Sequence, residues 1–284
     1  MAPWESDRTR YPCHSESPEG VEVRSTVKQA LSLAAGRGPA EGASLLIYHR
    51  VGGGSTDELD VTASAFELQL DLLADVDVVS LDDALDRLAD NDASPRFVLT
   101  FDDGFADLYE HAWPLLRRRG LPFTVYLASA YMGAAMQWEG ATARDSTAPG
   151  LTWVQLAEMV ESGLCTVGNH THHHVRPEVL DQTELDACTD VVRERLGVTP
   201  RHFAYPWGVP VPAMEPALRE RFRSAATGDL GRNLPGTDPM RLHRVPVRRT
   251  DPPSFFAAKL RGTLLPERTY AGIVGSAKRV GLRG

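Results

Sequence analysis

The chain has 284 residues, of which 30 are lysine or arginine and 38 are aspartate or glutamate, so its formal net charge is −8. With 42% hydrophobic and 24% charged residues, it has the composition of a globular protein, which excludes a disordered, collagen-like or fibrous chain. The acidic balance also disfavours nucleic acid or an anionic membrane surface as a partner, because both attract clustered lysine and arginine.

The N-terminal segment and the cysteines bear on localisation. The first 20 residues contain no apolar core of a secretory signal, and no run approaches the roughly 18 apolar residues of a membrane helix. Cys13, Cys165 and Cys188 form no C-x-x-C pair, so we expect neither a disulfide framework nor a thiolate zinc site. We therefore expect a cytoplasmic protein, with export by another route left open. We interpret residues 1–40 as an extension that is partly disordered or forms one short helix at 25–35, packed on the domain.

Strand and helix patterns alternate along the rest of the chain. Short apolar runs predict strands at 43–48, 76–80, 97–101, 122–127, 165–168, 202–205 and 245–247. Helical patterns follow at 64–73, 81–88, 106–119, 152–163, 183–196 and 213–223. Residues 133–150 are rich in alanine, glycine and threonine and predict a long loop. This alternation predicts an α/β fold with parallel strands, formed as one barrel-like domain over residues 41–284.

Two adjacent carboxylates end the expected strand at 97–101. They are Asp102 and Asp103 of the segment TFDDG, in which Gly104 permits a tight turn. An ordinary loop with a helix N-cap is one interpretation. The other is functional, because active sites of α/β barrels lie at the carboxyl ends of the strands. In that case one carboxylate binds a metal ion and the other stays free as a base.

A histidine cluster follows the expected strand at 165–168. Four of the nine histidines lie within residues 170–174 (HTHHH). An H-x-x-x-H pair can direct two imidazoles at one ion, and one aspartate would complete the three-ligand site with an open position that catalytic zinc prefers. A surface histidine tract is the alternative. We expect His172 and His173 to face solvent or to support the site.

A third segment, FAYPWG at residues 203–208, has the pattern of a strand leading into a turn. Together and in this order, the three segments resemble the polysaccharide deacetylase family, also called NodB-homology or carbohydrate esterase family 4. The resemblance covers residues 43–250 and implies a distorted (β/α) barrel of about seven strands. It also implies metal-dependent removal of acetyl groups from N-acetylated sugars. By this resemblance Asp102 is the general base. Asp103, His170 and His174 bind a divalent ion, zinc first, with Co²⁺, Ni²⁺ or Fe²⁺ as alternatives.

The sequence departs from the family pattern at two positions. Where many members have an arginine that orients the base, this chain has Ala204, and Arg244 is the candidate replacement. Many members also take their general acid from a late Leu-x-His segment, and the nearest late histidine here is His243. The early segment LIYHRV and the FAYPWG form resemble the bacterial poly-N-acetylglucosamine deacetylase branch, in which the acid comes from the early strand. We therefore favour His49 over His243 as the acid.

The resemblance implies that the backbone N–H of Trp207 stabilises the oxyanion. The rings of Trp207 and Trp138 are candidates to stack on sugar, whereas Trp153 has the position of a packing residue. The expected substrate is an N-acetylglucosamine-type glycan, or a lipid-linked or nucleotide-linked precursor. Alternatives are a metal-dependent amidase, imidase or O-acetyl esterase acting on a small molecule, and an inactive glycan-binding barrel. The sequence leaves the oligomeric state open.

Overall fold

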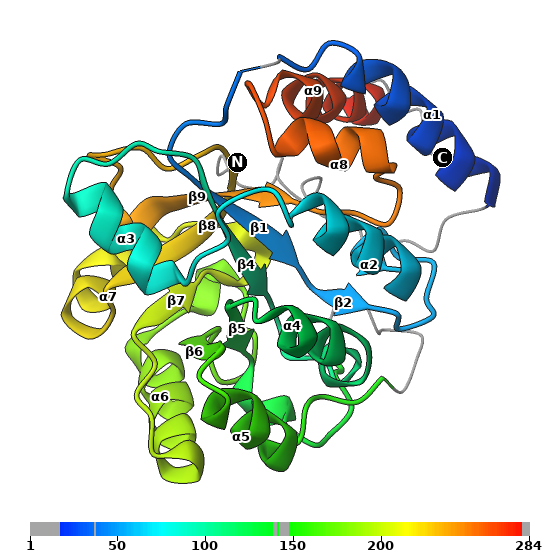
Figure 1. The fold of residues 1–284 in the computed structure, drawn as a ribbon. Coiled ribbons are helices and arrows are strands. Elements are labelled where there is room, and N and C mark those ends of the chain that lie inside the picture. Colours follow the sequence, from blue (N-terminus) through cyan, green and yellow to red (C-terminus); the bar gives the residue numbers. More distant parts are fainter. Residues whose placement is uncertain (1–17, 37, 139–140, 142–147, 280–284) are drawn as a thin grey trace.

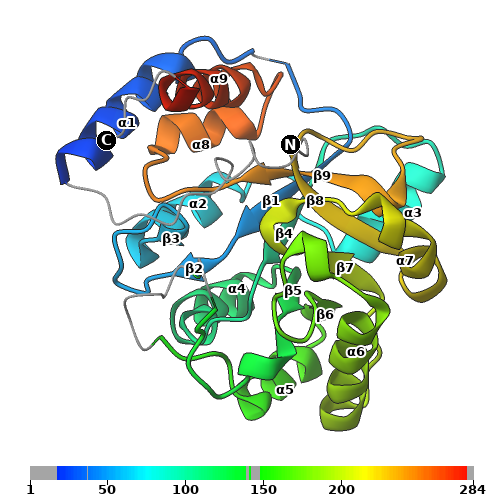
Figure 2. The same ribbon diagram turned by 180° about the vertical axis from the view of Figure 1, so that it is seen from behind.

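The computed structural model describes residues 18–36, 38–138, 141 and 148–279. Its centre is a closed barrel of seven parallel strands in the order β1-β4-β5-β6-β7-β8-β9, which confirms the predicted (β/α) barrel (Figures 1 and 2). A two-stranded sheet, β2-β3, lies beside it. The strand bounds are β1 Ala43–Tyr48, β2 Arg50–Val51, β3 Asp60–Val61, β4 Arg96–Phe101, β5 Phe123–Leu127, β6 Cys165–Asn169, β7 His202–Ala204, β8 Ser224–Leu230 and β9 Leu242–Pro246.

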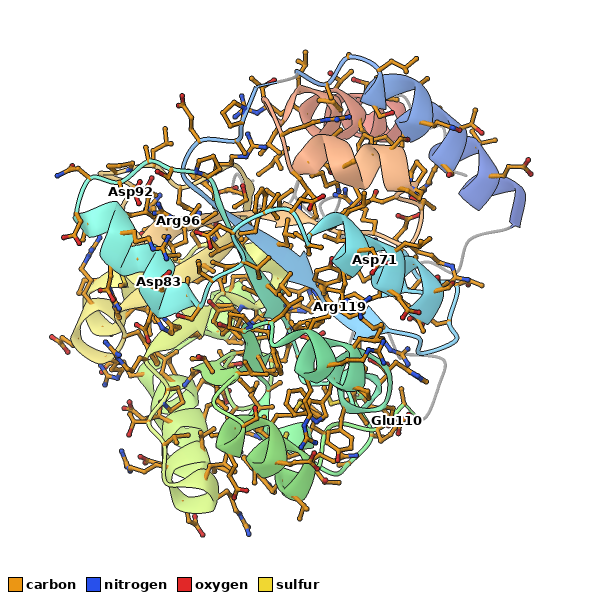
Figure 3. All side chains as sticks on the ribbon, viewed as in Figure 1. Asp71, Asp83, Asp92, Arg96, Glu110 and Arg119 are labelled. Atoms are coloured by element: carbon orange, nitrogen blue, oxygen red, sulfur yellow. The ribbon has the colours of Figure 1, made fainter. Side chains whose placement is uncertain are left out.

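Helices surround the barrel (Figure 1). Their bounds are α1 Pro18–Ser32, α2 Ala63–Leu72, α3 Leu81–Ala89, α4 Trp113–Arg119, α5 Trp153–Glu161, α6 Gln182–Leu196, α7 Glu215–Arg221, α8 Pro253–Lys259 and α9 Leu265–Arg279. On the outer surface α2 and α4 lie side by side, and Arg119 Nη2 is 2.6 Å from Asp71 Oδ1 (Figure 3). Within the described part of the chain, no helix has the length and apolar character needed to cross a bilayer.

Alternation along each strand divides the core into two layers. Leu45, Val98 and Tyr126 belong to the cluster inside the barrel, together with small residues such as Ala204 and Ala226. Their strand neighbours, among them Leu46, Leu99 and Val125, pack outward against the helices. Because successive side chains of a strand point to opposite faces, the even-numbered residues of β4 and β9 point inward, including Asp102 directly after β4 and Arg244.

The N-terminal helix packs against the barrel domain. Helix α1 lies beside α8 and α9 (Figure 1) and begins earlier than the expected 25–35. Its Lys28 is buried, and Lys28 Nζ donates to Asp251 Oδ1 at 2.8 Å. Lys259 Nζ, from α8, contacts the other oxygen of the same carboxylate at 2.6 Å. This buried ionic cluster joins α1 to the loop after β9. The expectation of partial disorder concerns mainly residues 1–17, which lie outside the described residues.

One predicted strand is wrong. Residues 76–80 form no strand, and Val78 makes a single parallel bridge with Phe97. The reason lies in the barrel: β4 pairs with β1 along its whole length and with β5 from Leu99 onward. Only the first residues of β4 therefore have a free edge, and the 76–80 segment can pair there at one point.

Buried His202 predicts a pH dependence of stability. Its Nδ1 lies 2.9 Å from Ser224 Oγ, and burial lowers the pKa of His202 to about 4 despite the nearby Asp82. The unfolded chain, with an ordinary histidine pKa near 6.5, takes up a proton between pH 6.5 and 4 while the folded chain does not. The stability that depends on neutral His202 is therefore fully present above pH 6.5 and is lost as the pH falls toward 4. From pH 7 to pH 5 the expected loss is about 2 kcal/mol. In denaturant titrations, the free energy of unfolding of His202→Gln should fall by about 2 kcal/mol less than that of the parent between pH 7 and pH 5. Equal decreases in both proteins would contradict the assignment to His202.

Candidate active site

The barrel topology brings the three sequence motifs to one end of the molecule. TFDDG follows β4, the histidine segment follows β6, and FAYPWG spans β7 and the short turn Pro206–Gly208. His49 directly follows β1, which pairs with β4 on one side and β9 on the other. Because all the barrel strands run parallel, their carboxyl ends open on the same face.

Asp103, His170 and His174 form a compact buried group. One ligand atom of each lies within 4.8 Å of the others. Asp103 Oδ1 is 3.4 Å from His170 Nε2 and 3.3 Å from His174 Nε2, and it has no hydrogen-bond partner among the residues that the structure describes. An orphaned buried carboxylate oxygen facing two imidazole nitrogens fits a divalent cation, because these three donors match a catalytic zinc site.

The electrostatics of this group favour a cation. Burial acts to raise the pKa of Asp103, but the nearby imidazoles of His170 and His174 outweigh it and hold this pKa well below its ordinary value. Burial also opposes charge on His170, yet Asp103 and Asp102 raise its pKa. For His174 burial dominates and lowers the pKa. The pocket thus keeps an ionised carboxylate and attracts positive charge.

The backbone of the histidine segment is fixed from β6 and α6. Thr171 and His174 adopt left-handed φ angles of 67° and 51°. Asn169 Oδ1 accepts a hydrogen bond from the Thr171 N–H at 2.9 Å, while Asn169 Nδ2 donates to the Leu185 carbonyl at 2.8 Å. These bonds hold the turn that directs His170 and His174 toward Asp103.

His172 and His173 have other partners. His172 Nδ1 lies 2.7 Å from Ser129 Oγ, and His173 Nδ1 lies 2.8 Å from Glu184 Oε1. Glu184 also accepts from the His173 N–H at 2.8 Å. Both residues therefore support the turn without joining the group of Asp103, His170 and His174, and His173 is the more exposed of the two.

Arg244 contacts the second aspartate. Arg244 Nη1 lies 2.7 Å and 2.8 Å from the two carboxylate oxygens of Asp102, and both side chains are buried. Arg244 Nε donates to the Thr227 carbonyl at 2.7 Å. The guanidinium thus reaches Asp102, directly after β4, from an inward-pointing residue of β9. The ring centroid of Tyr126 lies 5.9 Å from the guanidinium. Tyr126 was not predicted as a site residue, because in the sequence it is one of several apolar residues of a strand.

The two candidate acids lie on different faces of the barrel wall. The charges of Asp103 and Asp102 act on the half-buried imidazole of His49, although desolvation is the larger effect and lowers its pKa. His243 neighbours inward-pointing Arg244 and therefore points outward. It packs on Gly231, where an added Cβ would lie 2.9 Å from His243 Cγ.

Aromatic rings surround His174. The Trp207 ring meets it edge-on at a centroid distance of 5.4 Å, and Trp207 has a left-handed φ of 63°. The Trp138 ring stacks on it at 4.4 Å. Trp153 begins α5 and packs against the outer core, as expected for a packing residue.

Comparisons with known proteins show which chains this one is similar to. The polysaccharide deacetylase family model matches residues 89–220. The structure of IcaB from Ammonifex degensii is similar with 30% identity and a TM-score of 0.64, over 78% of this chain and 97% of IcaB. The Streptococcus pyogenes deacetylase PplD in complex with acetate, 20% identical over 78% of this chain and 99% of its own, shares the fold with a TM-score of 0.65.

A curated relative, YxkH of Bacillus subtilis (strain 168), is 28% identical over 135 residues. That alignment spans 46% of this chain and 43% of YxkH, less than half of the relative's length. The IcaB match, by contrast, extends over nearly the whole of that chain. On the family model, the near-complete IcaB match and the seven-stranded barrel together, this chain belongs to the polysaccharide deacetylase family.

Proposed function

We propose that the chain is a metal-dependent hydrolase that removes N-acetyl groups from an N-acetylated sugar and releases acetate. The observation that carries the proposal is the arrangement of two adjacent aspartates. Asp103 faces His170 and His174, whereas Asp102 pairs with Arg244 beside them. One carboxylate is thus available to a cation and the other to a proton, which is the division of roles that amide hydrolysis by water requires.

The proposed roles follow from position. Asp103, His170 and His174 would hold a divalent ion, zinc by donor type, and such an ion supplies Lewis acidity toward a carbonyl and activates water at neutral pH. Asp102 accepts the proton of the water that attacks the acetamide carbon, and Arg244 fixes the orientation of its carboxylate. The Trp207 backbone N–H donates to the developing oxyanion. His49, as imidazolium, protonates the departing amine as the C–N bond breaks, leaving acetate and an amino sugar.

The substrate class is proposed from the family and from the aromatic rings at the site. Trp207 and Trp138 lie beside His174, and aromatic rings at such a site can stack on a pyranose ring. The segments LIYHRV and FAYPWG also resemble the poly-N-acetylglucosamine deacetylase branch. We therefore propose an N-acetylglucosamine-type glycan or its precursor as substrate. Nothing in this proposal requires a nucleic acid partner.

Acetate release tests the function. Purified protein is incubated with N-acetylglucosamine oligomers, lipid-linked N-acetyl sugars and small N-acetyl amides, and acetate is measured with and without a chelator. We expect release from an N-acetylated sugar, loss after chelation and recovery on adding Zn²⁺. Release from small amides alone would favour the amidase alternative. A protein that binds the oligomers without releasing acetate would favour an inactive binding barrel.

Replacing the proposed acid tests its assignment. His49→Ala is expected to retain its metal and lose about 10²–10⁴-fold in turnover, because an amine departs poorly without a proton. His243→Ala, on the outward face of β9, is the matched control and should stay near the parent rate. Near-normal activity of His49→Ala together with inactive His243→Ala would reverse the assignment.

A further inference from the structure

The two histidines of the proposed metal site are held in different ways. His170 Nδ1 lies 2.8 Å from the Ala204 carbonyl, so a hydrogen bond sets its ring orientation. His174 points Nε2 toward Asp103, which leaves Nδ1 to carry the proton of the neutral ring. That Nδ1 is buried and has no hydrogen-bond partner in the part of the chain that the structure describes. Metal-binding histidines almost always bond through the second ring nitrogen, so His174 needs another support.

Trp138 provides the closest ring contact to His174. The two rings stack with centroids 4.4 Å apart and planes 24° from parallel. Trp207 closes another side edge-on, at 5.4 Å and 62°. Rotation of the imidazole about its Cβ–Cγ bond would tilt it away from the Trp138 ring, so stacking favours one ring orientation.

Trp138 is itself held by the loops that carry the metal ligands. Its ring centroid lies 6.1 Å from Phe105, two residues after Asp103, and 4.9 Å from Tyr131. The Tyr131 hydroxyl donates to the His173 carbonyl at 3.3 Å, next to His174 in the chain. The aromatic cluster therefore contacts the loop after β4 and the segment after β6, and these two loops supply all three proposed ligands.

We propose that Trp138 is a positioning residue that fixes the imidazole of His174 by stacking and thereby raises the affinity of the site for a divalent ion. The inference rests on the proposed metal site. In a protein without the Trp138 ring, the His174 imidazole would be free to rotate until the ion binds. Ordering the imidazole at that step costs conformational entropy, which would weaken binding of the ion. An aromatic ring is required, whereas the indole N–H is not.

Zinc affinity, measured by competition with a chromophoric chelator, tests the proposal. Residues that orient a metal ligand typically change affinity by about 10–100-fold, and we expect this loss for Trp138→Leu. Trp138→Phe, which keeps a ring, should stay within about threefold of the parent, well below that range. Trp153→Leu removes an indole from the outer core and is the matched control, with parental zinc affinity. Trp138→Met gives the same ring-free comparison if the leucine variant folds poorly.

Two further measurements separate positioning from general stability. Thermal melts of the metal-free proteins should coincide for the parent, Trp138→Leu and Trp138→Phe. Co²⁺ should quench tryptophan emission in the parent, and the quenched amplitude should fall in Trp138→Phe although that variant still binds the ion. Equal zinc affinity of Trp138→Leu and the parent, or equal losses in the leucine and phenylalanine variants, would overturn the proposal. A parent that binds no divalent ion would instead refute the proposed metal site itself.

Discussion

His170→Ala is expected to leave the protein folded but without its divalent ion, and to reduce acetate release to the level of the metal-stripped parent. Removing this side chain takes away one of the three proposed ligands and leaves Asp103 facing a single imidazole. The loss of metal affinity should exceed the roughly 10–100-fold that supporting residues contribute. Metal content after dialysis, measured by mass spectrometry, and acetate release with added Zn²⁺ give the two readouts.

The neighbouring histidine offers a control in the same segment. His173 has a side-chain exposure of 57% and bonds Glu184 rather than the ligand group. His173→Ala should keep its metal and most of its activity. Should His170→Ala retain a full equivalent of metal, the three-ligand site would be wrong, however active the variant proves to be.

Asp102→Asn is expected to bind zinc as the parent does while kcat falls about 10²–10⁴-fold, the range that general base catalysis typically contributes. The amide keeps the size of the carboxylate beside Arg244 but cannot accept the proton of the attacking water. Asp103 Oδ1 remains in place facing His170 and His174, so the metal site is preserved. Steady-state acetate release and metal content measured on the same preparation provide the comparison.

An exposed aspartate serves as the control for that substitution. Asp75 lies on the surface after α2, and Asp75→Asn should match the parent in both measurements. Loss of metal from Asp102→Asn would show that Asp102 is itself a ligand. A rate within a few-fold of the parent would show that another group accepts the proton.

The local patterns in the sequence were sufficient for most of the secondary structure and for the barrel. Apolar runs predicted the strands β1, β4 and β5, which are buried on both sides because a parallel strand lies between the barrel interior and the helix layer. The helix ends have typical cap residues: Thr152 caps α5, and Gly120 ends α4 with a φ of 63°. The expected helix at 106–119 begins instead with a π-helical turn at Leu108–Ala112.

Strand β8 escaped prediction for a structural reason. Its sequence, SAATGDL, contains one large apolar residue and has no strand pattern. It pairs with β7 and β9, and Ala226 belongs to the interior core cluster that also contains Tyr126. An inward-pointing alanine occupies little of the interior, across which Arg244 reaches Asp102. Small residues are therefore suited to a position that only the closed barrel defines.

What the sequence determined by itself was the set of chemical groups and their order along the chain: adjacent aspartates, an H-x-x-x-H pair and alternating strands and helices. These signals are local, since each depends on residues a few positions apart. Tertiary structure alone decided that Arg244 meets Asp102 across 142 positions of sequence, that His243 points away, and that Trp138 stacks on His174. Such contacts depend on which strands neighbour each other in the closed barrel and on which face each side chain occupies, and neither property is encoded in a short window of sequence.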